Sequence, residues 1–154
     1  MKVFRISVSL VLLICALFML TGSTASAAST WINRTASPGV ADLSWHALTS
    51  SADGTKLAAV VDVGDVWTSS DSGQHWTNQT TETDASGLFW KSIASSQDGT
   101  KLAAVESVFY TGVGDVWTST DSGQHWTNVS TTTTHLSGQN LLNVTSSATA
   151  QNWP

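Results

Sequence analysis

The residues that could carry chemistry gather in one short segment that occurs twice. "TSSDSGQHWTN" runs from Thr68 to Asn78, and "TSTDSGQHWTN" runs from Thr118 to Asn128. Each copy holds a serine, an aspartate and a histidine, the side chains that nucleophilic and acid–base catalysis use. However, the G-x-S-x-G surroundings of a nucleophile elbow do not occur in the chain. A catalytic aspartate would also need a repeated partner acid or base. The only candidates beside it are His75 and His125, whose side chains are expected to alternate outward into solvent, so the sequence favours a repeated fold element.

The duplication extends well beyond this segment. One unit covers about residues 43–80 and the next about residues 88–130, with Trp45 matching Trp90 and Trp67 matching Trp117. The second unit contains five extra residues around "SVFYTG". Residues 30–35 resemble the end of a unit and residues 141–148 resemble the start of one. The repeat is therefore the main organising feature of residues 28–154.

Each unit is predicted to form four short strands. "WHALTSS" alternates apolar and polar residues, as a half-buried strand does. Asp53-Gly54 and Asp98-Gly99 are hairpin signals that need positive φ. "KLAAVV", "GDVWTSS" and "HWTNQT" supply the next three strands of the first unit. Four antiparallel strands in every 45 to 50 residues predict an all-β chain of β-propeller-type blades.

The duplicated segment resembles the Asp-box, or BNR repeat. That family includes the repeats of sialidases, sortilin-type receptors, xyloglucan-cleaving hydrolases and photosystem II assembly factors. The resemblance implies a box in the turn between the third and fourth strands of a blade, away from the ligand face. Aspartate and serine can accept backbone N–H groups in such a turn, glycine can take a left-handed conformation, and tryptophan can pack between strands. A structural role is therefore expected for the box residues Ser69, Asp71, Gly73, Trp76, Ser119, Asp121, Gly123 and Trp126.

The enzymes of this family are not matched residue by residue. Their sialidases hold a carboxylate substrate with three arginines, whereas Arg34 is the single arginine of residues 28–154. The acids Asp62, Asp65, Glu106 and Asp115 could serve glycoside hydrolysis only loosely, and Asp65 and Asp115 are copies of each other at strand starts. Residues 28–154 lack cysteine, and the histidine and aspartate spacings match no zinc or calcium motif. We therefore expect a non-catalytic protein without a metal or cofactor.

The first residues have the order of a secretory signal peptide. Lys2 and Arg5 precede an apolar run, Ile6 to Leu20, which is too short to span a bilayer and is followed by small residues. Cleavage is expected after Ala27, giving a secreted chain of residues 28–154 without a membrane span. Four basic and eleven acidic residues remain, so a nucleic-acid partner is not expected.

Binding is the expected role, with a glycan or an extracellular protein as partner. Outward tryptophans suit sugar stacking, and the inserted loop is where the two units differ. The candidate ligand-binding residues are Trp67, Trp117, Phe109 and Tyr110. In a eukaryotic host, the sequons could carry N-glycans at Asn33, Asn78, Asn128 and Asn143.

Two other interpretations stay open. The chain could be a structural matrix protein without a defined pocket, or a truncated fragment of a larger propeller hydrolase. Propellers close with 4 to 8 blades, and two full units leave blade faces without neighbours. A homo-oligomer that completes the ring is therefore also expected.

Overall fold

A computed structural model describes residues 32–36, 38–107, 114–130 and 141–146. The predicted signal peptide and the candidate residues Phe109 and Tyr110 lie outside these ranges. Within the compact unit Asn33–Pro154, the described residues form strands and turns and no helix. No described residue belongs to a helix long and apolar enough to cross a membrane.

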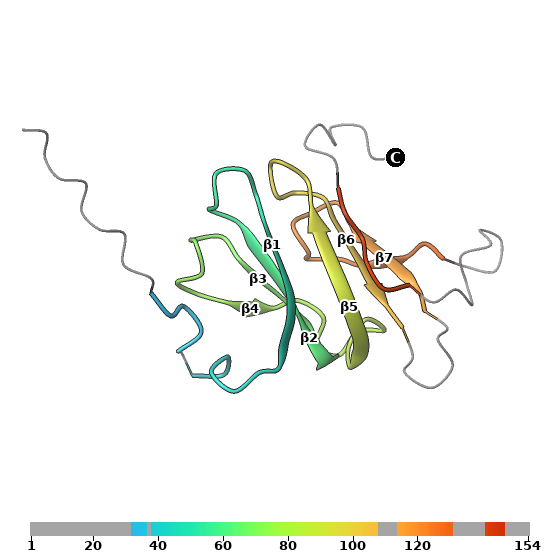
Figure 1. The fold of residues 1–154 in the computed structure, drawn as a ribbon, viewed down its shortest axis with the longest axis horizontal. Coiled ribbons are helices and arrows are strands. Elements are labelled where there is room, and N and C mark those ends of the chain that lie inside the picture. Colours follow the sequence, from blue (N-terminus) through green and yellow to red (C-terminus); the bar gives the residue numbers. More distant parts are fainter. Residues whose placement is uncertain (1–31, 37, 108–113, 131–140, 147–154) are drawn as a thin grey trace, which may run out of the picture. The chain divides into compact units, whose positions relative to one another are not determined.

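The strands form two successive antiparallel meanders, which we call blade 1 and blade 2 (Figure 1). Blade 1 consists of β1 (Trp45–Ser50), β2 (Leu57–Gly64), β3 (Val66–Ser69) and β4 (Thr77–Asn78). Blade 2 consists of β5 (Leu88–Ser95), β6 (Leu102–Glu106), β7 (Val116–Ser119) and β8 (Thr127–Asn128). Each strand pairs with the next in its blade. The prediction of an all-β chain built from antiparallel propeller-type blades is confirmed.

Each blade has a tryptophan face, here called the front, and an opposite rear face. The alternation of side chains along a strand separates the two faces. On the front of blade 1, the Trp45 ring lies 6.3 Å from that of Trp67 and 5.4 Å from that of Trp76. On the front of blade 2, the Trp90 ring lies 6.4 Å from Trp117 and 6.2 Å from Trp126. The rear faces carry small and β-branched residues, Ala58 and Val60 in blade 1 and Ala103 and Val105 in blade 2.

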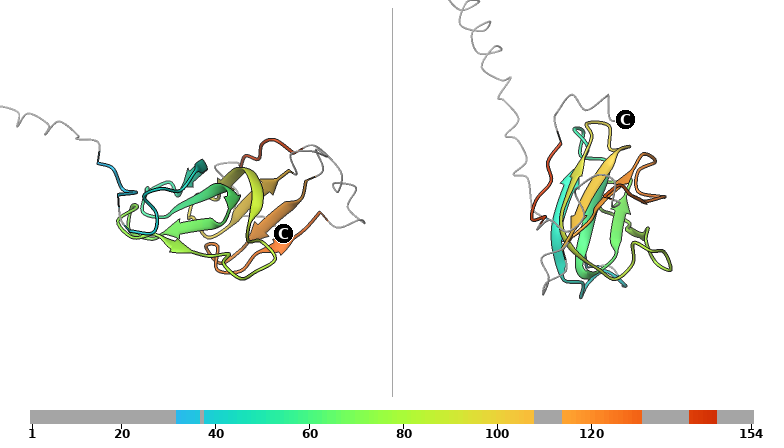
Figure 2. Two further views of the ribbon diagram at one scale, coloured as in Figure 1. Left: turned by 90° about the horizontal axis from the view of Figure 1, so that it is seen from below. Right: turned by 90° about the vertical axis from the view of Figure 1, so that its right-hand side faces the viewer.

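The core lies where the front of blade 2 packs against the rear of blade 1. Trp90 is fully buried there among Ala58, Val60, Leu102 and Ala104. The two meanders lie side by side in Figure 1 and in the left view of Figure 2. A short ladder also joins them, pairing Asp62 with Phe89 and Gly64 with Leu88. Because a buried indole removes a large apolar area from water, this contact is expected to contribute strongly to stability.

The two Asp-Gly hairpins follow the prediction in part. Gly54 and Gly99 have φ of 71° and 70°, but the preceding aspartates keep negative φ, unlike a two-residue type I′ hairpin. Instead, the Gly54 N–H donates to the Ser51 carbonyl at 3.0 Å, which closes a longer loop. The fourth strands are also shorter than predicted, at two residues each. The side chains that follow them bond to other parts of the blade.

The partial units at 30–35 and 141–148 form no regular strand where they are described. Residues 141–146 nevertheless contact β5. The Ser92 hydroxyl donates to Asn143 Oδ1 at 2.7 Å, and the Ser146 hydroxyl donates to the Ser95 carbonyl. In the repeat alignment, Ser92 corresponds to Asn143 and Ser95 to Ser146. The segment therefore lies on blade 2 in the position that the first strand of a following blade would take.

Candidate functional site

Both boxes form the same closed turn. The Ser69 hydroxyl accepts the Gly73 N–H at 2.9 Å and donates to Asp71 Oδ1 at 2.9 Å. The same Oδ1 accepts the His75 N–H at 2.9 Å, while Oδ2 lies 2.5 Å from His75 Nδ1. In the second box, Ser119, Asp121, Gly123 and His125 repeat these four contacts within 0.1 Å.

The turn needs two consecutive residues in the left-handed region. Ser72 and Gly73 have φ of 58° and 82°, and Ser122 and Gly123 have 62° and 91°. Two positive φ angles at the central positions are those of a type I′ turn. The sequence predicted this conformation for the glycines but not for the serines. The Ser72 N–H also donates to the Thr55 carbonyl at 2.9 Å, so the box braces the β1–β2 hairpin.

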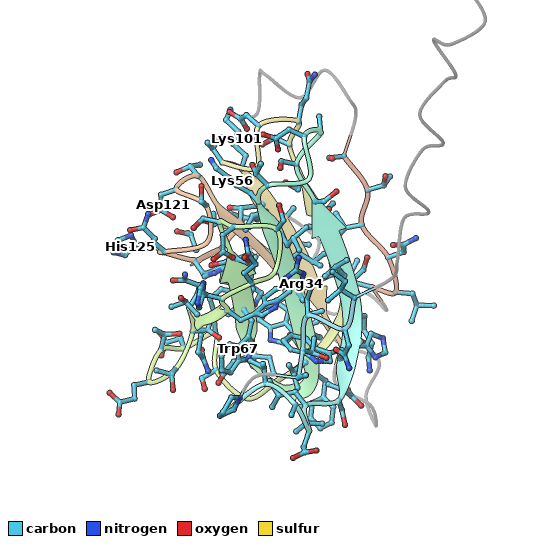
Figure 3. The ribbon with its side chains drawn as sticks, turned by 90° about the vertical axis from the view of Figure 1, so that its left-hand side faces the viewer. Arg34, Lys56, Trp67, Lys101, Asp121 and His125 are labelled. Atoms are coloured by element: carbon cyan, nitrogen blue, oxygen red, sulfur yellow. The ribbon has the colours of Figure 1, made fainter. Side chains whose placement is uncertain are left out.

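The histidines of the boxes are strongly exposed, at 89% for the His75 side chain and 88% for His125. His125 projects from the surface beside Asp121 (Figure 3). The same contacts set the acidity of the aspartates. Hydrogen bonds from the His75 backbone and ring hold the pKa of Asp71 well below its usual range. Burial raises the pKa of Asp121, but hydrogen bonds from His125 and Ser119 outweigh it and lower the pKa to about 2.

We propose that the boxes are structural, and Asp121→Ala tests this. The variant removes an acceptor from the Ser119 hydroxyl and the His125 N–H, so the free energy of unfolding should fall by about 1–2 kcal/mol. The folded pKa of about 2 lies below the unfolded value. The contribution of Asp121 is therefore complete above about pH 4 and is lost as pH falls through the folded pKa. Thermal melts between pH 7 and pH 2 should show that the difference in melting temperature between wild type and variant decreases as the pH falls. A difference that does not depend on pH would count against this role.

A second carboxylate network holds the outer edge of each blade. Asp65 Oδ2 accepts Asn78 Nδ2 at 2.6 Å, and Asp65 Oδ1 accepts the hydroxyls of Thr80 at 3.1 Å and Ser86 at 2.7 Å. The fully buried Thr80 hydroxyl also accepts the Val66 N–H at 3.0 Å. Burial raises the pKa of Asp65, but these hydrogen bonds outweigh it and the net shift is downward. We call this arrangement the edge clasp.

Blade 2 repeats the edge clasp with Asp115, Asn128 and Ser130. Asp115 accepts Asn128 Nδ2 at 2.8 Å and the Ser130 hydroxyl at 2.6 Å. Two predicted glycosylation sites, Asn78 and Asn128, thus use the side-chain nitrogen that would carry a glycan to bond an aspartate. The matching 13-residue separations of Asp65 from Asn78 and Asp115 from Asn128 were the available sequence signal. Sequence reasoning took Asp65 and Asp115 as blade architecture but did not connect them to the sequons.

The other two sequons do not form a clasp. Asn33 is exposed, and its Oδ1 accepts the Thr35 N–H and hydroxyl, both at 2.9 Å. Asn143 is also exposed and accepts the Ser92 hydroxyl through Oδ1.

The loosely matched acids of a glycosidase lie in different surroundings: Asp65 and Asp115 in the edge clasps, Glu106 in the interior and Asp62 at the surface. Glu106 is buried, and its Oε1 accepts the Asp115 N–H at 3.0 Å. Burial, and then the nearby Asp115 charge, raise the pKa of Glu106. Asp62 is exposed and lies 3.9 Å from the Lys91 ammonium. Among the described residues, no group of three or more histidine, cysteine, aspartate or glutamate side chains could hold a metal ion.

The two described tryptophans of the predicted ligand site differ in burial. Trp67 is half-buried, whereas Trp117 is 8% exposed and packs against Trp90. Trp117 nevertheless lines a cleft of about 400 Å³, here called the tryptophan cleft. Trp126 and His125 line it from the second box, and Gln79 and Asp84 line it from the β4–β5 connection. The cleft thus combines two indoles with several polar side chains, and small-ligand sites also join aromatic surface with polar groups that orient the ligand.

Three other hollows lie on the described surface. A box cleft of about 490 Å³ lies between the blades and is lined by polar residues such as Lys56 and His75 together with the apolar residues Leu57, Ala58 and Leu102. A hairpin cleft of about 640 Å³ lies between the two Asp-Gly loops and is lined by Lys56 and Lys101, which Figure 3 labels. A front groove of about 330 Å³ on blade 1 is lined by Thr35, Trp45, His46, Ala47, Leu48, Ala59 and Trp76.

No protein-family model matches the sequence, and no curated protein sequence matches it. Among solved structures, YCF48 bound to D1 peptide is similar over 56% of this chain and 26% of its own, at 20% identity and a TM-score of 0.45. A Niastella koreensis GH74 enzyme is similar over 56% of this chain and 11% of its own, at 24% identity and a TM-score of 0.42. The GH74 xyloglucanase from Xanthomonas campestris is similar over 66% of this chain and 16% of its own, at 18% identity and a TM-score of 0.48. The chain thus spans about a quarter or less of the length of these proteins.

Proposed function

We propose that this chain is a secreted, non-catalytic Asp-box repeat protein that binds a glycan in the tryptophan cleft. The observation that carries the proposal is the convergence of Trp117 and Trp126 with His125, Asp84 and Gln79 around one cleft. Aromatic side chains can contact the apolar face of a sugar ring, while the polar groups can bond its hydroxyls. His125 suits this role because Asp121 fixes one ring nitrogen and leaves the other for a ligand.

The state of the acidic residues supports the non-catalytic part of the proposal. Hydrolysis of a glycosidic bond needs two carboxyl groups that flank the bond. Asp65 and Asp115 are bonded within the edge clasps, and Asp71 and Asp121 are bonded within the boxes. Their oxygens stabilise turns and strand ends, and only Asp84 among the acids lines the tryptophan cleft.

The two histidines provide a matched pair for testing the site. His125 lines the tryptophan cleft, whereas His75 makes the same bond to its own box but lines the box cleft. A glycan array with the purified protein identifies a ligand, and fluorescence titration then measures its affinity. We expect His125→Ala to weaken binding about tenfold, the value of one hydrogen bond to a ligand, and His75→Ala to leave it unchanged.

Melting temperatures provide the control, because both variants lose an equivalent contact with a box aspartate and should be destabilised alike. Equal affinities for the two variants would show that the ligand binds outside the tryptophan cleft. If no glycan on the array binds saturably, the glycan part of the proposal is wrong.

A further inference from the structure

The front faces of the two blades are equivalent in sequence but not in burial. The front of blade 2 is covered by blade 1, and Ile93 there is 6% exposed. Its counterpart on the front of blade 1 is Leu48, which is 62% exposed beside Ala59 and Trp67. Trp45, the counterpart of the fully buried Trp90, is also only half-buried. Blade 1 therefore presents a front face that resembles one already used for packing in this chain.

The indole nitrogens of the first-strand tryptophans also differ, although Nε1 of Trp117 and Trp126 in blade 2 has no hydrogen-bond partner among the described residues, as is the case for Trp76 in blade 1. Trp90 Nε1 donates across the blade interface to the Gly64 carbonyl at 3.1 Å. Trp45 Nε1 is also buried, yet it has no hydrogen-bond partner among the described residues. A buried donor without a partner costs free energy that a neighbouring carbonyl can recover.

The partial unit at 30–35, which resembles the end of a preceding blade, contributes Arg34 to the outer side of this face. Arg34 Cβ lies 3.2 Å from the position that a Cβ on Gly73 would occupy. Gln79, the counterpart of Arg34, lies at 3.8 Å from the equivalent position on Gly123. The outer side of the face is therefore partly covered, while the front groove around Trp45 and Leu48 stays open.

Successive units meet at equivalent residues in or directly after their first strands. In the loops that follow β1 and β5, the Ala52 N–H donates to the carbonyl of its counterpart Gln97 at 2.8 Å. Segment 141–146 continues the series on β5, with Ser92 bonded to its counterpart Asn143. The segment turns Leu142, which is 67% exposed, outward. The next member of the series would be another first strand with an apolar front face, and β1 is such a strand.

We propose that the front groove of blade 1 is the docking surface for a second copy of this chain, which covers it with segment 141–146. Leu142 of the second copy meets Trp45 and Leu48 of the first. The interface is head-to-tail, because the two copies contribute different surfaces. The dimer keeps one free groove, on the second copy, and one free segment, on the first, so association continues to a ring or a longer assembly.

Sedimentation velocity over a range of concentrations tests this proposal on the purified protein. Wild type is expected to form species larger than one chain. Leu48→Glu and Leu142→Glu should each raise the concentration needed for association at least about tenfold, because each removes an apolar side chain from the interface. Val63→Glu is the matched control, since Val63 is 56% exposed and lies on neither surface; it should associate like wild type.

The decisive measurement mixes the two variants. Each retains one intact surface, so the mixture should form a 1:1 dimer and nothing larger, although each variant alone is a monomer. Thermal melts confirm folding, and Leu48→Lys replaces Leu48→Glu if that variant fails to fold. A wild type that stays monomeric at every concentration overturns the proposal. So does association that neither variant weakens, or a mixture that forms no dimer.

Discussion

Replacing Trp90 with alanine is expected to cost about 3–5 kcal/mol of unfolding free energy, close to the whole stability of a small domain. The side chain is fully buried, contacts the rings of Trp117 and Trp126, and donates to the Gly64 carbonyl. Its removal leaves a cavity at the centre of the blade interface. Urea unfolding followed by circular dichroism measures the loss.

Trp45→Ala is the matched control for this prediction. Trp45 occupies the equivalent position in blade 1 but is only half-buried. Its replacement should cost about 1–2 kcal/mol, since less apolar area is withdrawn from water. The comparison is made at low protein concentration, where self-association does not contribute. Equal losses for the two variants would show that the interface between blades 1 and 2 is not the main core.

Asp65→Ala should be the second most damaging of these substitutions, at about 2–4 kcal/mol. The variant removes the acceptor shared by Asn78, Thr80 and Ser86, and the Thr80 hydroxyl is fully buried. Strand β4 and the connection to β5 then lose their common attachment. Thermal melts and hydrogen exchange of the amides in residues 77–87 measure the effect.

Asp62→Ala controls for the loss of a carboxylate in the same region. Asp62 is exposed and lies 3.9 Å from the Lys91 ammonium, the geometry of a weak surface ion pair. Its removal should change stability by less than about 0.5 kcal/mol. An Asp65 variant as stable as the Asp62 variant would mean that the edge clasp contributes little to the fold.

Local sequence patterns were sufficient to predict the blades. The alternation in "WHALTSS" predicted β1, and the repeat then placed β5 at the matching residues. The positive φ of Gly73 and Gly123 followed from the turn chemistry of the box. These features depend on backbone geometry within a few residues, which is why a single sequence can indicate them.

Features that depend on neighbouring elements could not be predicted in the same way. The repeat matched Trp67 with Trp117, but it did not indicate that Trp117 would be buried while Trp67 stays half-buried. The edge clasp joins residues 13 apart through a turn, so neither periodicity nor turn composition indicates it. The Asn-x-Thr and Asn-x-Ser patterns of the clasp residues are also the signal for N-glycosylation. A single sequence does not distinguish a structural asparagine of this kind from a glycosylated one.

The contact between equivalent residues of successive units has a consequence for how such a chain can change length. Ala52 bonds to Gln97, and Ser92 bonds to Asn143, each residue meeting its own counterpart one unit later. Duplication of one whole unit would therefore keep counterpart positions in contact at each junction. Gain or loss of part of a unit would instead bring unlike residues together. The geometry of the junction therefore favours changes in length by complete units. Lineages that carry this repeat should differ in length by multiples of about one unit.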